Sequence, residues 1–300
     1  MTEKLVSILM PAYNCEKYIK LAIESILDQT HTNFELLIAD DCSTDNTKAI
    51  IDSYDDIRIK RFHNASNLGY LQASNKLFSQ CSGDYISFQD ADDFSSKDRF
   101  INLINYLNDH PEVACVGSNI MKIDADGKEF FSSEYPLVDK EIRIGFLNHR
   151  VVMTGSALLI KKEVIKEVGF YNLYFDRMGS EDTYWYSLIL DKYKVSNLNE
   201  RLYHYRANPN SVGFTHKDPR AKVGHNLVVL MYKRRLLSKK DFIATKEWDK
   251  ADASTKYLLA INKVKDSKMQ AIIDFVKATF TAPSLVTQFF REFGSNLRAV

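Results

Sequence analysis

The order of strand-like and helix-like segments in roughly the first 120 residues is the feature that most limits what this chain can fold into. Apolar runs and alternating apolar residues predict short strands at 5–10, 34–40, 57–62, 84–89 and 113–118. Between them, apolar residues spaced three or four apart predict helices at 15–30, 43–54, 70–81 and 95–110. Strands that alternate with helices form βαβ units. The predicted fold class is therefore α/β, with a mostly parallel sheet flanked by helices on both faces.

The pattern loosens in the second part of the chain. Residues 154–164 predict a turn of small residues, a strand and the start of a helix. Residues 180–193 predict a helix capped by Ser180, with two acids in its first turn, where the helix dipole favours negative charge. A strand that runs into a turn-rich loop is predicted at 201–213, and further helices are predicted across 220–300.

Positive charge is concentrated at the end of the chain. Residues 217–300 contain 17 Lys and Arg against 8 Asp and Glu, a net charge of +9, whereas the preceding residues contain 23 against 31, a net charge of −8. This asymmetry predicts a folded unit followed by a basic helical segment. The longest apolar runs, such as 227–231, are far too short to span a bilayer, and the N-terminus does not form a signal peptide. The four cysteines lack metal-binding spacing and predict reduced thiols in a cytoplasmic protein; they are Cys15, Cys42, Cys81 and Cys115.

Three polar clusters each follow directly after a predicted strand. They are "PAYN" at 11–14, "ADDCSTDNT" at 39–47 and "DADD" at 90–93. In open α/β sheets, ligands bind outside the carboxyl ends of the strands. We therefore expect the three clusters to meet at one edge of the sheet and to form a ligand site there.

The cluster at 90–93 places three carboxylates at the end of one strand, where like charges repel. Either the segment is a solvated turn or a cation lies beside it. Mg²⁺ is commonly held by one or two carboxylates together with substrate phosphates. On this interpretation Asp92 is the direct ligand, Asp90 meets a ribose hydroxyl or a metal-bound water, and Asp93 supports the site.

The other two clusters have structural alternatives. In 39–47, Asp40 or Asp41 could stabilise the turn while Ser43 or Thr44 caps the next helix; one acid suffices for a turn, which leaves Asp41 to accept from the imide N–H of uracil. In 11–14, the last residue could cap a helix, or the ring of Tyr13 could lie against a nucleobase.

Acids at the start of the helix predicted at 180–193 have two interpretations as well. Their sole role could be a favourable interaction with the helix dipole, or one of them could be a general base that takes the proton of an attacking alcohol. Other nucleotide-binding folds are poorly supported, because the chain has neither G-x-x-x-x-G-K-[ST] nor G-x-G-x-x-G after its first strand. Without a glycine cradle, phosphate binding again points to a metal at 90–93.

In combination these segments resemble family 2 glycosyltransferases of the GT-A fold. The similarity extends from residue 5 to about residue 213 and includes "VSILMPAYNCEKYIKLAIESILDQTHTNFELLIADDCSTDNT", "NLGYLQASNKLFSQCSGDYISFQDADD", "TGSALLIKKEVIKEVGFYN" and "SEDTYWYSLI". The resemblance implies a GT-A domain at 1–216, with a nucleotide-sugar-binding half at 1–118 and an acceptor-binding half at 119–216, followed by the basic helical region 217–300. It also implies transfer of a sugar from a nucleotide-sugar, most often a UDP-sugar, with inversion at the anomeric carbon.

The resemblance also implies roles for individual residues. Asp182 corresponds to the catalytic base. The donor-binding positions are Pro11, Ala12, Tyr13, Asn14, Asp41, Asn67, Asp90, Ala91 and Asp92. Of these, Asp90 and Asp92 form the D-x-D motif, and Asp92 carries Mn²⁺ or Mg²⁺ against the diphosphate. Gly155, Ser156 and Glu181 are assigned to the acceptor side.

One position departs from the family pattern. The family often has a histidine in the segment after the acidic helix, which helps to bind metal or diphosphate, whereas this chain has Asn208 there. An asparagine can bind a metal through its carbonyl oxygen but carries no charge. His204 or His216 could replace the missing imidazole, or Arg206 could neutralise the diphosphate.

The basic region 217–300 includes "KRRLLSKK" at 233–240, which is either a solvated helix face or a surface for anionic lipid headgroups or glycan. Family acceptors are often lipid-linked or capsular saccharides, so we expect a cytoplasmic protein that contacts the inner face of the plasma membrane. The same helices could form a homodimer. Two other functions stay open: an inactive glycosyltransferase-like binding protein, and a nucleotidyltransferase.

Overall fold

The computed structural model describes residues 4–176 and 179–207, and five single positions between 225 and 236. The chain divides into two compact units. The first comprises Met1–Arg177 and Leu188–Thr215, and the second comprises Met178–Ser187 and His216–Val300. The basic region predicted at 217–300 lies almost entirely outside the described residues.

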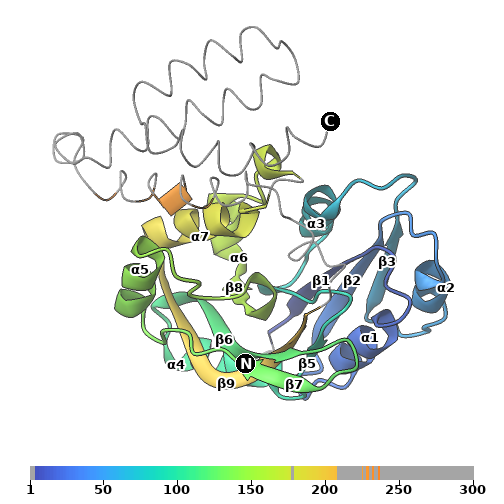
Figure 1. The fold of residues 1–300 in the computed structure, drawn as a ribbon, viewed down its shortest axis with the longest axis horizontal. Coiled ribbons are helices and arrows are strands. Elements are labelled where there is room, and N and C mark those ends of the chain that lie inside the picture. The colour runs from blue at the N-terminus through green and yellow to red at the C-terminus, as the bar shows by residue number, and fades with distance from the viewer. Residues whose placement is uncertain are drawn as a thin grey trace, which may run out of the picture. The chain divides into compact units, whose positions relative to one another are not determined.

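The first unit is built on one curved, mixed sheet (Figure 1). Its strands are β1 (Val6–Ala12), β2 (Phe34–Asp40), β3 (Ile59–His63), β4 (Tyr85–Phe88), β5 (Phe94–Ser95), β6 (Val113–Ile123), β7 (Glu129–Ser132), β8 (Leu159–Lys161) and β9 (Lys194–Arg206). They lie in the order β3-β2-β1-β4-β8-β6-β9-β5, and β7 pairs with β6. The α/β fold class is thereby confirmed, but the sheet is more mixed than the predicted mostly parallel one, because antiparallel strand pairs are as frequent as parallel ones.

The two halves of the sheet differ in strand direction. The pairs β3–β2, β2–β1 and β1–β4 are parallel, as the alternation of strands and helices predicts. Beyond β4, the neighbour β8 is antiparallel to both β4 and β6, β6 and β9 are parallel, and β5 is antiparallel to β9. Sequence analysis did not predict the short strands β5 and β7.

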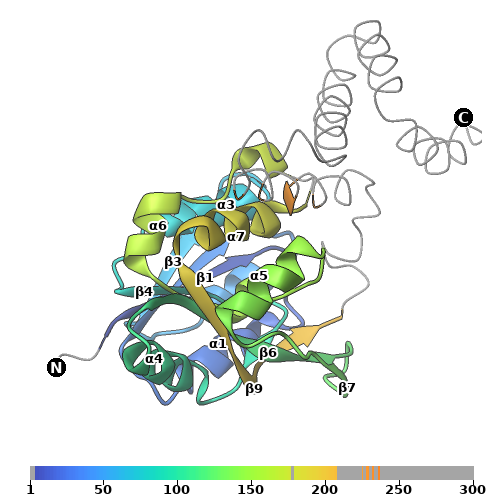
Figure 2. The ribbon, with the colours of Figure 1, turned by 90° about the vertical axis from the view of Figure 1, so that its left-hand side faces the viewer.

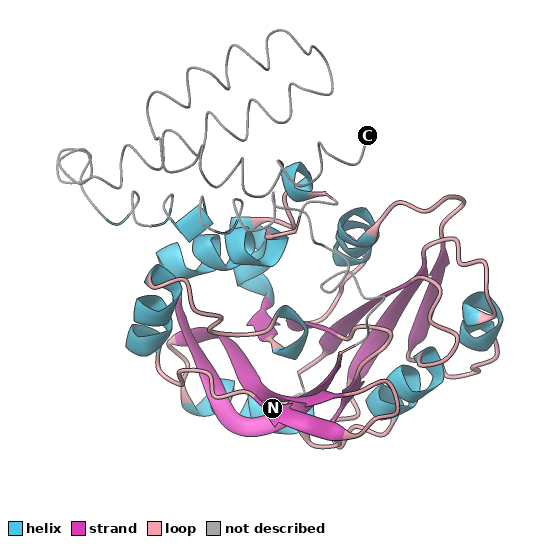
Figure 3. Ribbon diagram, in the orientation of Figure 1, coloured by secondary structure: helices cyan, strands magenta, loops and turns pink. Residues whose placement is uncertain are grey.

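Helices cover both faces of the sheet, as predicted (Figures 1, 2 and 3). They are α1 (Ile19–Leu27), α2 (Thr47–Asp52), α3 (Tyr70–Phe78), α4 (Arg99–Asp109), α5 (Asp139–Leu147), α6 (Lys162–Val168) and α7 (Glu181–Lys192), with 3-10 turns η1 (Gly155–Ala157) and η2 (Leu173–Phe175). The helices α1 and α4 lie on one face, and α3 and α6 lie on the other. The buried residues of α1 recur at helical spacing: Ile19, Ala22, Ile23 and Ile26.

The neighbouring strands β1 and β2 are almost completely buried, because helices pack on each side of the sheet. All seven residues of β2 are buried, including the two acids Glu35 and Asp40. Where the chain turns into β4, Gly83 lies so close to β1 that an added Cβ would come within 2.7 Å of the Ser7 nitrogen and 2.8 Å of the Leu5 oxygen. Only glycine fits this approach without a shift of the backbone.

One carboxylate is buried on β2, at its boundary with β1. Glu35 on β2 accepts hydrogen bonds from Lys60 Nζ at 2.5 Å, from the Ser82 N–H at 2.7 Å and from the Ser82 hydroxyl at 2.8 Å, and also from the Ser7 hydroxyl. Burial alone would raise the pKa of Glu35, but these hydrogen bonds outweigh it and lower the pKa to about 2. The ionised carboxylate therefore joins β1, β2, β3 and the turn before β4.

We expect Glu35→Gln to lower the free energy of unfolding by about 3 kcal/mol at neutral pH, because a pKa difference of one unit corresponds to about 1.4 kcal/mol. The folded pKa lies below the unfolded value, so this stabilisation is present above about pH 4.5 and is lost as the pH falls towards about 2. Urea unfolding at several pH values should show wild type and variant converging over that range. The exposed Glu134→Gln is the control, and a gap of constant size at every pH would contradict the assignment.

Candidate active site

The three polar clusters meet at one edge of the sheet, as predicted from the strand ends. β1 and β2 run in parallel with Ala12 paired to Asp40, and the Asp41 N–H donates to the Ala12 oxygen at 2.8 Å. β4 lies on the other side of β1, with Phe88 paired to Leu9. The segments after the three strands are therefore neighbours in space.

Asn14 joins the first two clusters. It lies in the left-handed region at φ 48° and accepts at Oδ1 from the Thr44 N–H at 2.8 Å, while its own N–H donates to the Ser43 hydroxyl at 3.0 Å. Helix α1 begins later, after Tyr18, and has no side-chain cap. The alternative that Asn14 caps a helix is therefore wrong; its side chain holds two loops together. The ring of Tyr13, one residue earlier, is 49% exposed.

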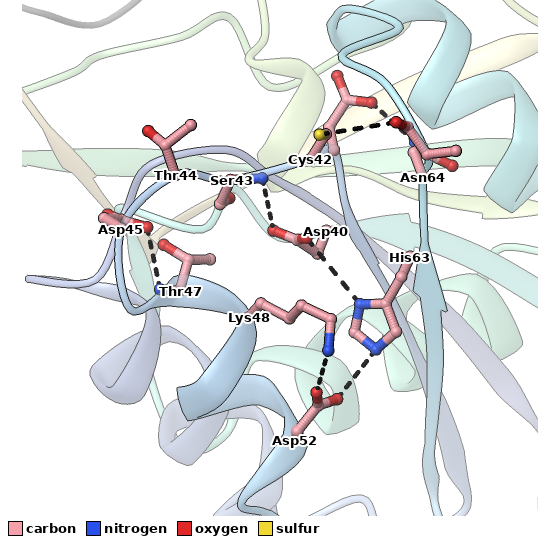
Figure 4. A network of polar contacts seen from close by, with 12 residues as sticks. Asp40, Cys42, Ser43, Thr44, Asp45, Thr47, Lys48, Asp52, His63 and Asn64 are labelled. Carbon is pink, nitrogen blue, oxygen red and sulfur yellow. Dashed lines mark hydrogen bonds and ion pairs between the residues drawn. The ribbon is translucent and has the colours of Figure 1, made fainter.

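The start of α2 also differs from expectation. Neither Ser43 nor Thr44 caps this helix; instead Asp45 accepts from the Thr47 N–H at 2.9 Å (Figure 4). Asp45 also accepts from the Glu16 N–H at 3.0 Å, which adds a further link between the first two clusters. The capping prediction failed because Ser43 and Thr44 bond across to Asn14.

The adjacent acids Asp40 and Asp41 have different roles. Asp40 is buried, accepts from the Ser43 N–H at 3.3 Å and lies 4.0 Å from Nδ1 of His63, so it is the acid that stabilises the turn (Figure 4). On its far side His63 meets Asp52 at 2.9 Å, and Asp52 in turn meets Lys48 at 2.7 Å. This chain of contacts secures the edge strand β3 to α2.

Asp41 holds the loop before α3. Its carboxylate accepts from Asn64 Nδ2 at 2.7 Å, from the Leu68 N–H at 2.9 Å and from the Gly69 N–H at 2.8 Å. Asn67, predicted to bind the donor, lies exposed in the same loop. A carboxylate has about four acceptor positions, so these three bonds leave Asp41 Oδ2 with capacity for one more donor.

The D-x-D segment begins one residue after β4 ends. Asp90 accepts from the Ser156 hydroxyl and, at 3.5 Å, from the Tyr70 hydroxyl; its own N–H donates to the Tyr203 hydroxyl at 3.0 Å. Asp93 is buried and accepts from the Arg206 N–H at 2.6 Å. The half-buried Asp92 carboxylate accepts no hydrogen bond from another residue in the described part of the chain, and Ala91 beside it is buried.

All three acids are more easily protonated than usual. Burial and the neighbouring Asp90 charge raise the pKa of Asp92 to about 6. Burial raises the pKa of Asp90, and burial together with the charges of Asp90 and Asp92 raises that of Asp93 well above its ordinary value. Clustered carboxylates of this kind are stabilised by a nearby positive charge.

Part of that charge comes from Arg99, which sequence analysis missed. Arg99 begins α4 and is fully buried. Its guanidinium donates to the Phe88 oxygen at 3.1 Å, to the hydroxyls of Ser95 and Ser87 at 2.9 Å each, and to the Ser156 oxygen. Its position in an amphipathic helix gave no sign of burial, because the partners lie on other elements.

Arg206 is the second buried arginine near the acids. Its guanidinium donates to the main-chain carbonyl oxygens of Asp92 at 2.8 Å and of Asp124 at 2.9 Å. It also lies 4.4 Å from the centre of the Tyr18 ring. The side chain is buried and its charge opposes the rise in the pKa of Asp92. Its suggested role towards a diphosphate stays a prediction.

His204 on β9 is the suggested replacement for the missing imidazole, and that role stays a prediction. Its ring stacks on Phe94, with centroids 4.2 Å apart, and its Nε2 lies 3.7 Å from Glu129. Burial lowers its pKa. Asn208 and His216 lie outside the described residues, so the departure from the family pattern is not resolved there.

No group of three His, Cys, Asp or Glu side chains within 4–176 and 179–207 is placed to hold a metal ion. The residues nevertheless fit a divalent cation that shares its ligands with a substrate. Asp92 is a half-buried carboxylate that accepts no hydrogen bond from another described residue, and Asp90 adds a second negative charge. Mg²⁺ and Mn²⁺ prefer oxygen ligands, and Mg²⁺ commonly uses one or two carboxylates plus phosphates.

The acceptor-side residues fall in two places. Gly155 and Ser156 form the buried turn η1 in the first unit, where Ser156 meets Asp90. Glu181 and Asp182 lie in the first turn of α7, which begins close to the predicted start. Both acids belong to the second compact unit.

All four cysteines are free thiols, as predicted. Burial raises the pKa of Cys15, Cys81 and Cys115 to about 12, so these three are poor nucleophiles. Within the described residues, no helix combines the length and the hydropathy needed to cross a membrane.

Comparisons with known proteins identify the family. Residues 7–169 match the family described as Glycosyl transferase family 2. TuaG of Bacillus subtilis (strain 168), named as a candidate glycosyltransferase of teichuronic acid biosynthesis, is 30% identical over 216 residues, covering 69% of this chain and 81% of the relative. WfaP of Escherichia coli, named UDP-Glc:alpha-D-GlcNAc-diphosphoundecaprenol beta-1,3-glucosyltransferase, is 28% identical, covering 70% of this chain and 80% of the relative.

Among solved structures, residues 1–349 of S. aureus TarS in complex with UDP-GlcNAc align with a TM-score of 0.65 and 16% identity, covering 91% of this chain and 79% of TarS. At this identity the likeness shows the fold alone.

Proposed function

The chain belongs to glycosyl transferase family 2, and on that premise we propose that it moves a sugar from a nucleotide-sugar, most directly a UDP-sugar, to a hydroxyl of a saccharide or lipid-linked saccharide. That it is a glycosyltransferase follows from the family and from its relatives. The finer proposal is supported by the relatives' names. TuaG is named for teichuronic acid biosynthesis, and WfaP for a UDP-glucose donor and a diphosphoundecaprenol acceptor. We assign this chain to cell-surface polysaccharide synthesis on the same basis.

The observation that carries the proposal is Asp92, a half-buried carboxylate beside Asp90 that accepts no hydrogen bond from another described residue. A divalent cation, Mn²⁺ or Mg²⁺, would rest on Asp92, with Asp90 contributing charge or a ribose contact. When bound, it would neutralise the charge that develops on the departing diphosphate.

The remaining donor contacts follow the strand ends. Tyr13 offers an exposed ring to the base, and Asp41 Oδ2 has the acceptor capacity that a uracil imide N–H needs. The main chain of Pro11, Ala12 and Asn14, with Asn67 and Ala91, would complete the pocket. Because Asp41 also holds the 64–69 loop, the base and the loop would share one carboxylate.

The proposed chemistry is a single displacement. Asp182 takes the proton of the acceptor hydroxyl, and the oxygen attacks C1 of the sugar from the face opposite the nucleotide. The new C1–O bond forms as the C1–O bond to the diphosphate breaks, so the electron pair leaves with the nucleotide and the configuration inverts. The transition state has oxocarbenium character. Glu181 would orient the acceptor, and Gly155 and Ser156 would lie beside it.

The function is tested by incubating the protein with a panel of UDP-, GDP- and dTDP-sugars and Mn²⁺, and measuring free sugar and nucleotide. We expect slow hydrolysis of one donor, which would identify it. Donor binding without any turnover would favour the alternative of an inactive binding protein. Release of pyrophosphate from a nucleoside triphosphate and a sugar phosphate would instead indicate a nucleotidyltransferase.

The basic region 217–300 carries a second proposal, that the protein associates with the inner face of the plasma membrane through anionic lipid headgroups; its net charge of +9 is the support. We expect co-sedimentation with vesicles containing phosphatidylglycerol at low salt, weakening as salt is added, and none with phosphatidylcholine alone. Failure to bind the anionic vesicles at low salt would count against it. Gel filtration tests the proposed homodimer.

A further inference from the structure

We propose that Arg99 is a positioning residue for the donor site, and that it acts through Ser156 on the D-x-D carboxylate Asp90. This proposal rests on the proposed function, in which Asp90 and Asp92 bind the nucleotide-sugar donor and its divalent cation. Neither Arg99 nor this role of Ser156 followed from the sequence, which assigned Ser156 only to the acceptor side.

Arg99 attaches η1 to the end of β4. One terminal nitrogen of Arg99 donates both to the Phe88 oxygen at 3.1 Å and to the Ser156 oxygen. The main chain of η1 is therefore fixed to the last residue of the strand that delivers the D-x-D segment. Phe88 and Ser156 are far apart in sequence, and the guanidinium holds both at one point.

Ser156 in turn contacts Asp90. With its main chain held by Arg99, Ser156 directs its hydroxyl to Asp90 Oδ2. Tyr70 donates to the other oxygen, Oδ1, at 3.5 Å, and the Tyr203 hydroxyl accepts from the Asp90 N–H at 3.0 Å. Ser156 and Tyr70 together set the orientation of the carboxylate beside Asp92.

The choice of arginine follows from this geometry. The planar guanidinium reaches oxygens on β4, β5 and η1 at once, and it lies 4.9 Å from the centre of the Tyr203 ring. Lysine has a single nitrogen and cannot hold this many fixed directions. A fully buried cation is costly unless counter-charges are close, and Asp90 and Asp93 are the acids whose charges act on Arg99.

The test is a double-mutant cycle on nucleotide binding. Arg99→Lys, Ser156→Ala and the combined variant are compared by calorimetric titration with UDP, and with GDP, in the presence of Mn²⁺. Arg150→Lys and Ser53→Ala are matched controls on exposed positions outside the site. Thermal unfolding of each protein establishes that the titrated samples are folded, and donor KM and kcat are measured alongside.

We expect each single variant to raise the Kd of the nucleotide about tenfold, since one hydrogen bond to a charged group is lost or misplaced. The combined variant should bind no more weakly than Arg99→Lys, because both changes interrupt the same path. The donor KM should rise with Kd, and kcat should change less. A merely structural arginine would lower the melting temperature and leave the Kd of the folded protein unchanged.

Unchanged Kd in folded variants, or effects that add in the combined variant, would overturn the proposal. If Arg99→Lys does not fold, Ser156→Ala alone decides, and a wild-type Kd in that variant rejects the role of Ser156. Failure of the proposed function gives a different result, because the wild type itself would then bind neither nucleotide in a manner that depends on Mn²⁺. That outcome would reject both the proposed function and the proposed role of Arg99.

Discussion

Asp92→Asn is expected to reduce sugar transfer about 10³-fold, the largest effect of any single change in the donor site. Asparagine has nearly the same shape but no charge, so the cation that neutralises the diphosphate would lose its direct protein ligand. Nucleotide binding in the presence of Mn²⁺ should weaken in parallel. Steady-state rates with the donor found in the panel measure the first effect, and calorimetry measures the second.

The same variant should not be less stable than the wild type. In the free protein Asp92 is half-buried and repelled by Asp90, so removal of its charge relieves an unfavourable interaction. Loss of activity together with an unchanged or higher melting temperature would identify a functional carboxylate and not a structural one. Asp126→Asn, an exposed acid in the turn before β7, is the control. Transfer within about tenfold of wild type in Asp92→Asn would refute the assignment.

Asp182→Asn is expected to lower kcat about 10³-fold while nucleotide binding stays close to wild type. An amide cannot accept the proton of the attacking hydroxyl, but the donor contacts assigned to 11–14, Asp41 and Asp92 do not involve this residue. The effect should therefore appear in kcat and not in the Kd of the nucleotide. Presteady-state measurement of sugar transfer, at saturating donor, separates chemistry from product release.

Two variants control for the position of Asp182 in a first helical turn. Glu163→Gln changes an exposed acid in the first turn of α6, where only the helix dipole is affected. Glu181→Gln changes the neighbouring acid and should raise the acceptor KM more than it lowers kcat. Near-normal transfer by Asp182→Asn would remove this residue as the base, and a full loss in Glu181→Gln with activity in Asp182→Asn would transfer the role to Glu181.

Much of the first half of the fold could be predicted, because the information is local. The apolar run at 5–10 becomes the buried strand β1, and helix-spaced apolar residues in 15–30 become α1. The rule that ligands bind at the carboxyl ends of strands then placed the three polar clusters together before any contact was known.

The part of the sheet beyond β4 could not be predicted in the same way. β5 is two residues long and therefore too short for a periodic pattern, whereas β8 lies within the segment 154–164 where a strand was predicted. Their antiparallel pairing with β9 and β4 depends on contacts between segments far apart in the chain. Strand direction in that half is a property of the tertiary structure and not of the local sequence.

Within the site, carboxylates were easier to predict than their partners. Asp90 and Asp92 are conspicuous in sequence because three carboxylates fall within four residues at the end of a predicted strand. Arg99 and Arg206 look like ordinary surface residues, yet they are buried and bond to oxygens of other elements. Asparagine is a preferred helix N-cap residue, but the tertiary contact with Thr44 determines the role of Asn14.

The most direct test of the central claim is to follow donor turnover by proton NMR, with Mg²⁺ as a diamagnetic cation and an α-linked nucleotide-sugar identified in the panel. The account predicts loss of the anomeric signal of the donor, release of the nucleoside diphosphate, and first appearance of the sugar as the β-anomer, before mutarotation. First appearance of the α-anomer, or no loss of donor signal with any nucleotide-sugar, would contradict it.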